Sequence, residues 1–283
     1  MKLPPLRYAA PATVPQACRL LADDPDAKAM AGGQSLMPLM AIRLAAPSTV
    51  VDLGRIPRLR RIELIDDQVR IGALTTHEQV IRSRVVRENA PLLADAGRHI
   101  AHAAIRTRGT IGGSIAHGDG AAEWPLALLA AGGRVTVTGV RGERTIAADA
   151  LFVGPFSTAL DADEVLTHVW VPRRTSGWGF GEFARRSGDY GLANVAVVLD
   201  MDGDVCRSAR IAVGAAVGTV QRSEPAEALV VGSPLDRANA KAAGAAAAES
   251  LAVIGDIHGS RPYRRHLVAA LVERTLQEAG SRS

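Results

Sequence analysis

Apolar positions in the first 55 residues follow helical and strand spacing in turn. The apolar residues of the segment 13–22 recur at intervals of three and four, so they share one face of a predicted helix. Short runs rich in apolar residues predict strands at 27–30 and 49–53, with a second helix at 36–44 between them. The order strand, helix, strand is typical of a βαβ-like unit.

The pattern changes after residue 56 and again near residue 175. Between these points strands alternate with helices, whereas three strands and then three helices follow residue 175. We therefore expect a first domain over 1–175, with subdomains of about 1–55 and 56–175, and a second, α+β domain over 176–283. The expected strands are 68–71, 134–138, 165–171, 179–185, 194–201 and 208–217, the last two joined by a turn at Asp202-Gly203, and the expected helices are 75–83, 91–100, 125–131, 225–231, 236–253 and 262–278.

Composition limits the class of protein without identifying it. Apolar residues make up 47% of the 283 residues, which is enough for a sizeable core. The net charge is +4, but arginines are interspersed with acidic residues and form no basic block, so we expect no nucleic-acid partner. No apolar run is long enough to span a bilayer, and the N-terminus does not resemble a signal peptide, so we expect a cytoplasmic protein.

The residues that bind metals are sparse. Two cysteines, Cys18 and Cys206, cannot form a disulfide framework, an iron–sulfur site or a cysteine-rich zinc site. A polar stretch contains His117, Asp119 and Glu123, but their spacing matches no named metal motif. We therefore expect no metal site, and a carboxylate that hydrogen-bonds a ligand is the favoured interpretation of this stretch.

Two glycine-centred segments carry the strongest functional indication. They are Ala-Gly-Gly-Gln-Ser at 31–35 and Thr-Ile-Gly-Gly-Ser at 110–114, and we expect both to be turns. Neither has the lysine of a P-loop, and neither fits G-x-G-x-x-G. Glycines let backbone N–H groups approach a ligand, and successive N–H groups form an anion site to which the hydroxyls of Ser35 and Ser114 add donors. The pair predicts a nucleotide or dinucleotide site that grips one diphosphate from two sides.

Other polar positions give weaker indications. No serine lies in a G-x-S-x-G motif, and nothing in the sequence indicates a hydrolytic triad. The segment 185–191 is interpreted either as a solvated connection or as a turn whose aromatic residue, Tyr190, covers a flat cofactor. We interpret His77, His99 and His102 as helix-surface or capping residues.

Five motifs occur in an order that resembles one family. They are AGGQSL at 31–36, IGALTTH at 71–77, IRTRGTIGGS at 105–114, RRSGDY at 185–190 and YRR at 263–265. Together they cover nearly the whole chain. The chain is therefore similar to the FAD-binding medium subunits of the molybdenum hydroxylases, the group of carbon monoxide dehydrogenase and xanthine dehydrogenase.

This resemblance implies a fold and a cofactor site. The implied fold is a two-subdomain FAD-binding domain of vanillyl-alcohol-oxidase-like (PCMH) type, followed by a C-terminal α+β domain of antiparallel sheet and helices. Both glycine segments would hold the FAD diphosphate, and Tyr190 would lie near the isoalloxazine ring. Ser114 and Glu123 stand where the family usually has Asn and Asp. The implied cofactor-binding residues are Ala31, Gly32, Gly33, Gln34, Ser35, Leu36, Thr110, Ile111, Gly112, Gly113, Ser114, Glu123, Leu166 and Tyr190.

The resemblance also implies a role and partners. The chain would be an electron-transfer subunit, in a dimer of heterotrimers with a large molybdopterin subunit and a small subunit that carries two 2Fe–2S clusters. FAD would receive electrons from those clusters and deliver them to NAD, oxygen, a quinone or another carrier. Because the flavin carries the chemistry, we expect no catalytic acid or base in this chain. The alternatives are a nucleotide-binding or assembly subunit without redox activity and a stand-alone flavin oxidoreductase.

Overall fold

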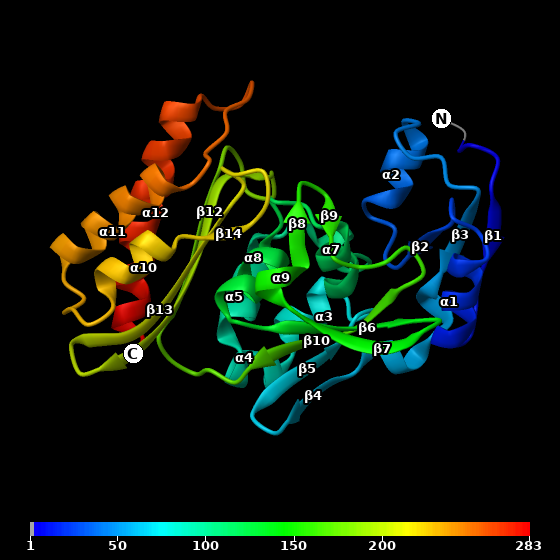
Figure 1. The fold of residues 1–283 in the computed structure, drawn as a ribbon, viewed down its shortest axis with the longest axis horizontal. Helices are drawn as coiled ribbons and strands as arrows, with labels where there is room; N and C mark the ends of the chain where they lie inside the picture. The colour runs from blue at the N-terminus through cyan, green and yellow to red at the C-terminus, as the bar shows by residue number, and fades with distance from the viewer. Residues whose placement is uncertain (1–2) are drawn as a thin grey trace.

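A small parallel sheet forms the N-terminal part of the computed structural model, which describes residues 3–283 (Figure 1). Its strands pair in the order β1-β3-β2. Helix α1 (Val14–Ala22) begins where the Thr13 hydroxyl accepts the Gln16 N–H, and it buries one apolar face. The strands are β1 (Arg7–Ala9), β2 (Lys28–Met30) and β3 (Thr49–Asp52), and the short helix α2 (Leu36–Ala41) follows β2.

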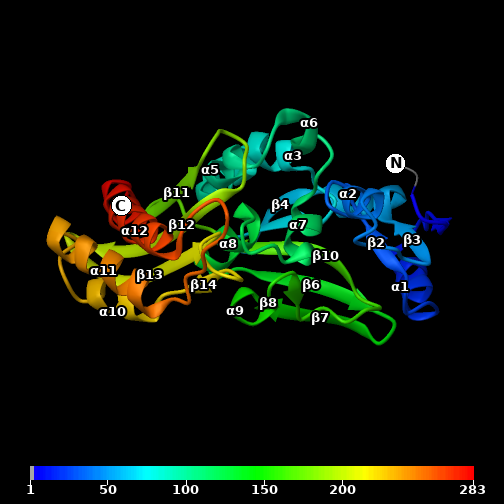
Figure 2. The same ribbon diagram turned by 90° about the horizontal axis from the view of Figure 1, so that it is seen from above.

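A five-stranded antiparallel sheet forms the middle part, in the order β4-β5-β10-β6-β7. Helices cover one face of it (Figures 1 and 2), and α8 (Glu123–Ala130) is buried almost all round because it lies between this sheet and the C-terminal one. The strands are β4 (Ile62–Ile65), β5 (Gln68–Gly72), β6 (Arg134–Gly139), β7 (Gly142–Ala147) and β10 (Val165–Pro172), with a small hairpin of β8 (Phe152–Gly154) and β9 (Ser157–Thr158). The other helices are α3 (His77–Arg82), α4 (Arg84–Asn89), α5 (Pro91–His99), α6 (Ala103–Arg106), α7 (Ile111–His117) and α9 (Ala148–Leu151), and two short 3₁₀ turns cover Leu53–Arg55 and Pro57–Arg60.

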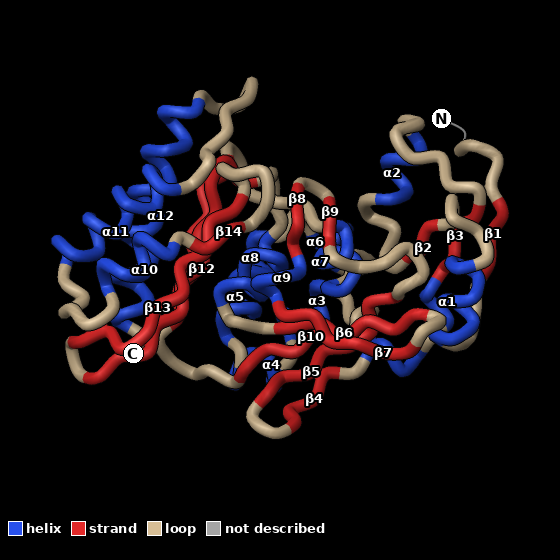
Figure 3. Tube along the Cα trace, in the orientation of Figure 1, coloured by secondary structure: helices blue, strands red, loops and turns tan. Residues whose placement is uncertain are grey.

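A four-stranded antiparallel sheet with three helices forms the C-terminal part. Figure 3 shows the helices on the outer face of this sheet. Along the central strand, alternate side chains belong to different cores: Val195 and Val197 pack with the C-terminal helices, whereas Ala196 and Val198 pack with the middle part. The elements are β11 (Trp178–Ala184), β12 (Gly191–Asp202), β13 (Val205–Gly214), β14 (Gln221–Arg222), α10 (Glu224–Val230), α11 (Arg237–Ser250) and α12 (Arg261–Ser281).

The expected α+β class, with an antiparallel sheet and helices at the C-terminal end, is confirmed. The long strands and helices lie where the hydrophobic pattern predicts them, with ends that differ by a few residues. The pattern missed short or polar elements such as β7, most of whose side chains are exposed. Among residues 3–283, no helix combines the length and the apolar character needed to cross a membrane.

Asp149 forms a charged contact between the middle part and the C-terminal sheet. Asp149 in α9 accepts hydrogen bonds from Arg210 at 2.8 Å and from Arg222 at 3.0 Å. Burial opposes the charge of Asp149, but these two hydrogen bonds outweigh it and lower the pKa of its carboxyl. We therefore expect this link to stabilise the fold above the usual pKa of an aspartate and to be lost as the pH falls through the lowered value.

Asp149→Ala is expected to lower the free energy of unfolding by about 1–2 kcal/mol at pH 7, because it removes the carboxylate that joins two largely buried guanidinium groups, of which Arg222 keeps Glu227 and Arg210 keeps the Leu129 carbonyl. Urea unfolding of the full chain measures this. Asp202→Ala is the matched control, since Asp202 forms an exposed pair with Arg207 and its loss should change the free energy by less than about 0.5 kcal/mol. Equal effects of the two substitutions would contradict the linking role of Asp149.

Candidate functional site

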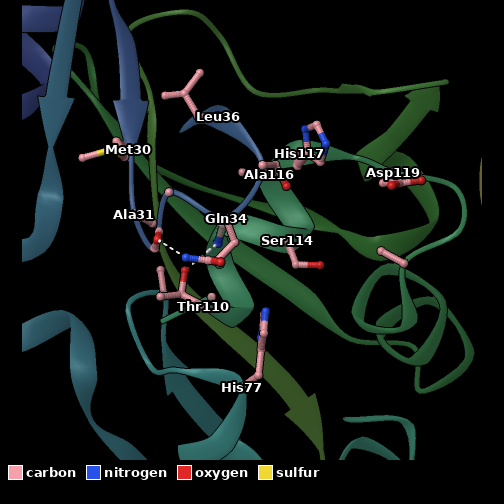
Figure 4. A pocket seen from close by; sticks show the side chains of 18 of the residues that line it. Met30, Ala31, Gln34, Leu36, His77, Thr110, Ser114, Ala116, His117 and Asp119 are labelled. Atoms are coloured by element: carbon pink, nitrogen blue, oxygen red, sulfur yellow. Dashed lines mark hydrogen bonds between the residues drawn. The ribbon is translucent and has the colours of Figure 1, made fainter. Parts of the chain in front are cut away.

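A cleft of about 540 Å³ lies where the three parts meet. Such a volume falls in the range of small-molecule and cofactor sites. Its walls come from the loop between β2 and α2 and from α7, which Figure 4 shows facing one another. The segment before α8, strand β10 and the turn at 188–190 complete the walls. Every residue that the sequence analysis proposes for the cofactor lines this cleft except Ile111, whose side chain is 1% exposed and lies in the core beneath α7.

The first glycine segment presents unused hydrogen-bond donors to the cleft. Gly33 has φ 72°, a conformation that glycine adopts at little cost. The backbone N–H groups of Gly32 through Ser35 have no acceptor within residues 3–283, and Ser35 begins α2 without a capping bond from its hydroxyl. Four successive N–H groups without partners can bind an anion, as the sequence predicts for this segment.

The second glycine segment is different, and our expectation that it is a turn was wrong. Residues 111–114 form the first turn of α7, for which Thr110 is the N-cap. Their N–H groups, which a helix start usually leaves free, all have acceptors inside the protein. Ile111 donates to the Thr75 carbonyl at 3.0 Å, Gly112 to the Ala73 carbonyl at 2.9 Å, Gly113 to the Thr110 hydroxyl at 3.1 Å and Ser114 to the Thr110 carbonyl at 3.0 Å.

The glycines of both segments allow close packing of the backbone around α7. A Cβ at Gly112 would lie 2.4 Å from the Ala73 Cβ, so only glycine lets α7 approach the end of β5. A Cβ at Gly32 would lie 2.1 Å from the Arg108 carbonyl oxygen, in the segment that leads into α7. The first segment therefore supplies free N–H groups, whereas the second supplies a closely packed wall with the Ser114 hydroxyl facing the cleft (Figure 4).

Acidic groups and an aromatic ring mark the other end of the cleft. Glu123 and Asp119 line it, and Tyr190 stands at the rim with 72% of its surface exposed. Burial, followed by the nearby charges of Glu182 and Asp119, raises the pKa of Glu123 to about 8. Glu123 is therefore mostly protonated at pH 7, and its carboxyl can donate as well as accept a hydrogen bond. Leu166 on β10 adds an apolar contact.

His77 is a cleft residue that the sequence analysis misplaced. It is only 5% exposed and does not lie on a helix surface; Thr76 is the N-cap of α3, and the Trp124 indole N–H donates to His77 Nδ1 at 2.8 Å. Burial and the charge of Arg106 lower the pKa of His77 to about 4, so its ring is neutral at pH 7. The motif at 71–77 was the available signal, but nothing in it indicates a partner 47 residues away.

His99 and His102 agree more closely with their interpretation as helix-surface or capping residues. His99, near the end of α5, is half-buried and pairs with Glu182 at 3.7 Å between Nδ1 and Oε1. The carboxylate of Glu182, which accepts from the His99 ring, raises the pKa of His99. His102 is the N-cap residue of α6, although its side chain makes no capping bond.

Comparison with known proteins gives matches over the whole chain. Residues 4–174 match the family described as FAD binding domain in molybdopterin dehydrogenase, and residues 178–279 match the CO dehydrogenase flavoprotein C-terminal domain. The nicotine 6-hydroxylase medium subunit of Paenarthrobacter nicotinovorans is 57% identical over 283 residues, which is the full length of both chains. The carbon monoxide dehydrogenase medium chain of Hydrogenophaga pseudoflava is 35% identical, over 99% of this chain and 98% of that one.

Solved structures give the same result for the fold. Quinoline 2-oxidoreductase from Pseudomonas putida 86 superposes with a TM-score of 0.95 and 39% identity, over 99% of both chains. Carbon monoxide dehydrogenase from Hydrogenophaga pseudoflava superposes with a TM-score of 0.97 and 36% identity, over 100% of this chain and 99% of that one. At this identity and coverage, the chains are related in sequence and do not merely share a fold.

Proposed function

The chain belongs to the FAD-binding medium subunits of the molybdenum hydroxylase family, and from this membership we propose that it passes electrons from the 2Fe–2S clusters of a partner subunit to an external acceptor. It is a subunit of an oxidoreductase, and FAD is its cofactor. The likeness to complexes that contain molybdenum supports a large molybdopterin subunit and a small iron–sulfur subunit as its partners. We propose a dimer of heterotrimers, with NAD, oxygen, a quinone or another carrier as acceptor.

The cleft fits FAD, and this fit is the observation that carries the proposal. Four unpaired N–H groups at Gly32 through Ser35, with the hydroxyl of Ser114 opposite, suit an anionic diphosphate. At the other end, the neutral carboxyl of Glu123 can hydrogen-bond a ring or hydroxyl group, and Tyr190 can shield a flat surface at the rim. When bound, the flavin supplies redox chemistry that side chains cannot provide, while this chain binds and orients it.

The residues that line the cleft also support a division of the chain into domains. We propose a boundary near residue 175, with a cofactor domain over 1–175, itself divided near residue 55, and a second domain over 176–283. The turn at 188–190 contributes to the cleft, so the second domain would help to close the cofactor site. Cys18 and Cys206 are both buried free thiols, which supports a reducing compartment such as the cytoplasm.

The test uses the complex that copurifies with a tagged version of this chain. We expect a yellow complex that contains molybdenum and iron, is reduced by dithionite, and is rapidly reoxidised by one of the acceptors named above. Removal of FAD should stop the reoxidation, and its restoration should recover it. A colourless complex that never takes up FAD would favour the assembly-subunit alternative, and a chain that works without partners would favour a stand-alone flavin oxidoreductase.

A further inference from the structure

His77 is held in one orientation and one tautomer. The indole N–H of Trp124 can only donate, so His77 Nδ1 is an acceptor in their 2.8 Å hydrogen bond. Since the ring is neutral at pH 7, its single proton lies on Nε2. The backbone N–H of His77 also donates to the Gly109 carbonyl at 2.9 Å, which fixes the start of α3 against the segment that leads into α7.

The Nε2–H group has no partner in the part of the chain that the structure describes. His77 lines the cleft, and Figure 4 shows its ring pointing into the space between Gln34 and Ser114. No hydrogen bond to Nε2 exists within residues 3–283. A Cβ at Gly109 would lie 2.5 Å from Nε2, so the absence of a side chain at Gly109 keeps this donor uncovered.

This donor lies on the wall where donors are scarce. The N–H groups of residues 111–114 are all used within the protein, so side chains must supply the hydrogen bonds on this side of the cleft. In the free chain this donor faces the cleft, where water can accept its hydrogen bond, so a ligand that displaces the water must supply an acceptor in its place. Phosphate oxygens are suitable acceptors, and the facing N–H groups of the first glycine segment suit them as well.

We propose that His77 is a cofactor-binding residue whose Nε2–H donates to a diphosphate oxygen of FAD, with Trp124 and Gly109 as the residues that position and expose it. This inference rests on the placement of FAD in the cleft proposed above. Because the pKa of His77 is about 4, the ring stays neutral and keeps this donor at neutral and alkaline pH. Trp124 makes no contact with the cofactor in this arrangement and acts only by fixing the tautomer.

The first test is direct and needs no variant. In the full chain labelled uniformly with ¹⁵N, addition of FAD should shift the Nε2–H resonance of His77 and slow its exchange with water. ADP, which carries the diphosphate without the flavin, should have the same effect, and riboflavin should not. If FAD shifts the backbone N–H signals of residues 32–35 but not His77, the inference is wrong and the placement of FAD stands. If neither set shifts, the placement fails and the inference fails with it.

Variants provide the second test. Gly109→Ala should raise the Kd for FAD at least tenfold, because its methyl group would cover Nε2. His77→Gln, which keeps a donor of different reach, should weaken binding less than His77→Leu. Gly154→Ala is the matched control, since a Cβ there has no neighbour closer than 3.9 Å. An unchanged Kd in Gly109→Ala would overturn the inference, and should any variant fail to fold, the wild-type resonance still decides.

Discussion

Gly32→Ala is expected to yield a folded chain that purifies with little or no FAD. The new Cβ would lie 2.1 Å from the carbonyl oxygen of Arg108 and 2.8 Å from the Cα of Gly109, which are both backbone atoms. No side-chain rotation relieves such a contact, so the first glycine segment must move away from the segment that leads into α7. A shift of this size displaces the free N–H groups, and we expect the Kd for FAD to rise by roughly a hundredfold.

Two measurements separate this effect from unfolding. The FAD content per chain should fall below a tenth of the wild-type value, while far-ultraviolet circular dichroism stays unchanged and the free energy of unfolding falls by about 1–3 kcal/mol, as overpacking predicts. Gly154→Ala makes the same chemical change in open space and should keep its FAD. Retention of FAD by Gly32→Ala would show that the cofactor does not depend on this contact between the two segments.

The hydrophobic pattern predicted the elements that bury a regular face. Helix α1 and strand β12 were found because their apolar residues recur at the helical or strand period, and the structure uses those residues to fill its cores. Strand β7 was missed because its pairing with β6 leaves most of its side chains in solvent, so no period marks it. The hydrophobic pattern reveals amphipathic elements. It does not reveal a strand such as β7, which is extended because it pairs with a neighbouring strand.

The second glycine segment shows where tertiary contacts override local preference. Two consecutive glycines disfavour a helix, so residues 110–114 were expected to form a turn. The cap from Thr110 and the acceptors at Ala73 and Thr75 supply the hydrogen bonds that hold the helix start in place. Those acceptors lie more than thirty residues earlier in the chain, and no pattern within the segment could reveal them.

The location of the cleft was predictable from the motifs, but the protonation and hydrogen bonding of its residues were not. The motifs gave positions that line one cleft, apart from Ile111, since the glycines mark where backbones approach closely. They did not show which N–H groups remain free, nor that burial neutralises Glu123 and His77. These properties depend on packing across the cleft. The contacts of each residue with FAD remain predictions that the variants above test.

Glu123→Gln is expected to stabilise the flavin-free chain at alkaline pH. The pKa of this carboxyl is about 8 in the folded chain against the ordinary 4.5 of a glutamate, so the folded chain binds the proton more tightly than the unfolded one. Stability therefore falls as the pH rises from the lower value to the higher and is constant above it. The full shift corresponds to at most about 5 kcal/mol, and we expect about half of that after screening by solvent.

Thermal and urea unfolding between pH 5 and 9 measure this effect. The gain of Glu123→Gln over wild type should grow with pH and level off near pH 8, whereas Glu249→Gln, an exposed change on α11, should show no trend. A gain that does not depend on pH would mean that Glu123 is ionised in the folded chain.

The same proton should affect the cofactor, because an ionised Glu123 adds negative charge to a cleft that binds an anion. FAD affinity should therefore fall several-fold above pH 8 in the wild type but stay constant in Glu123→Gln, which links the charge of this carboxyl to the retention of the flavin.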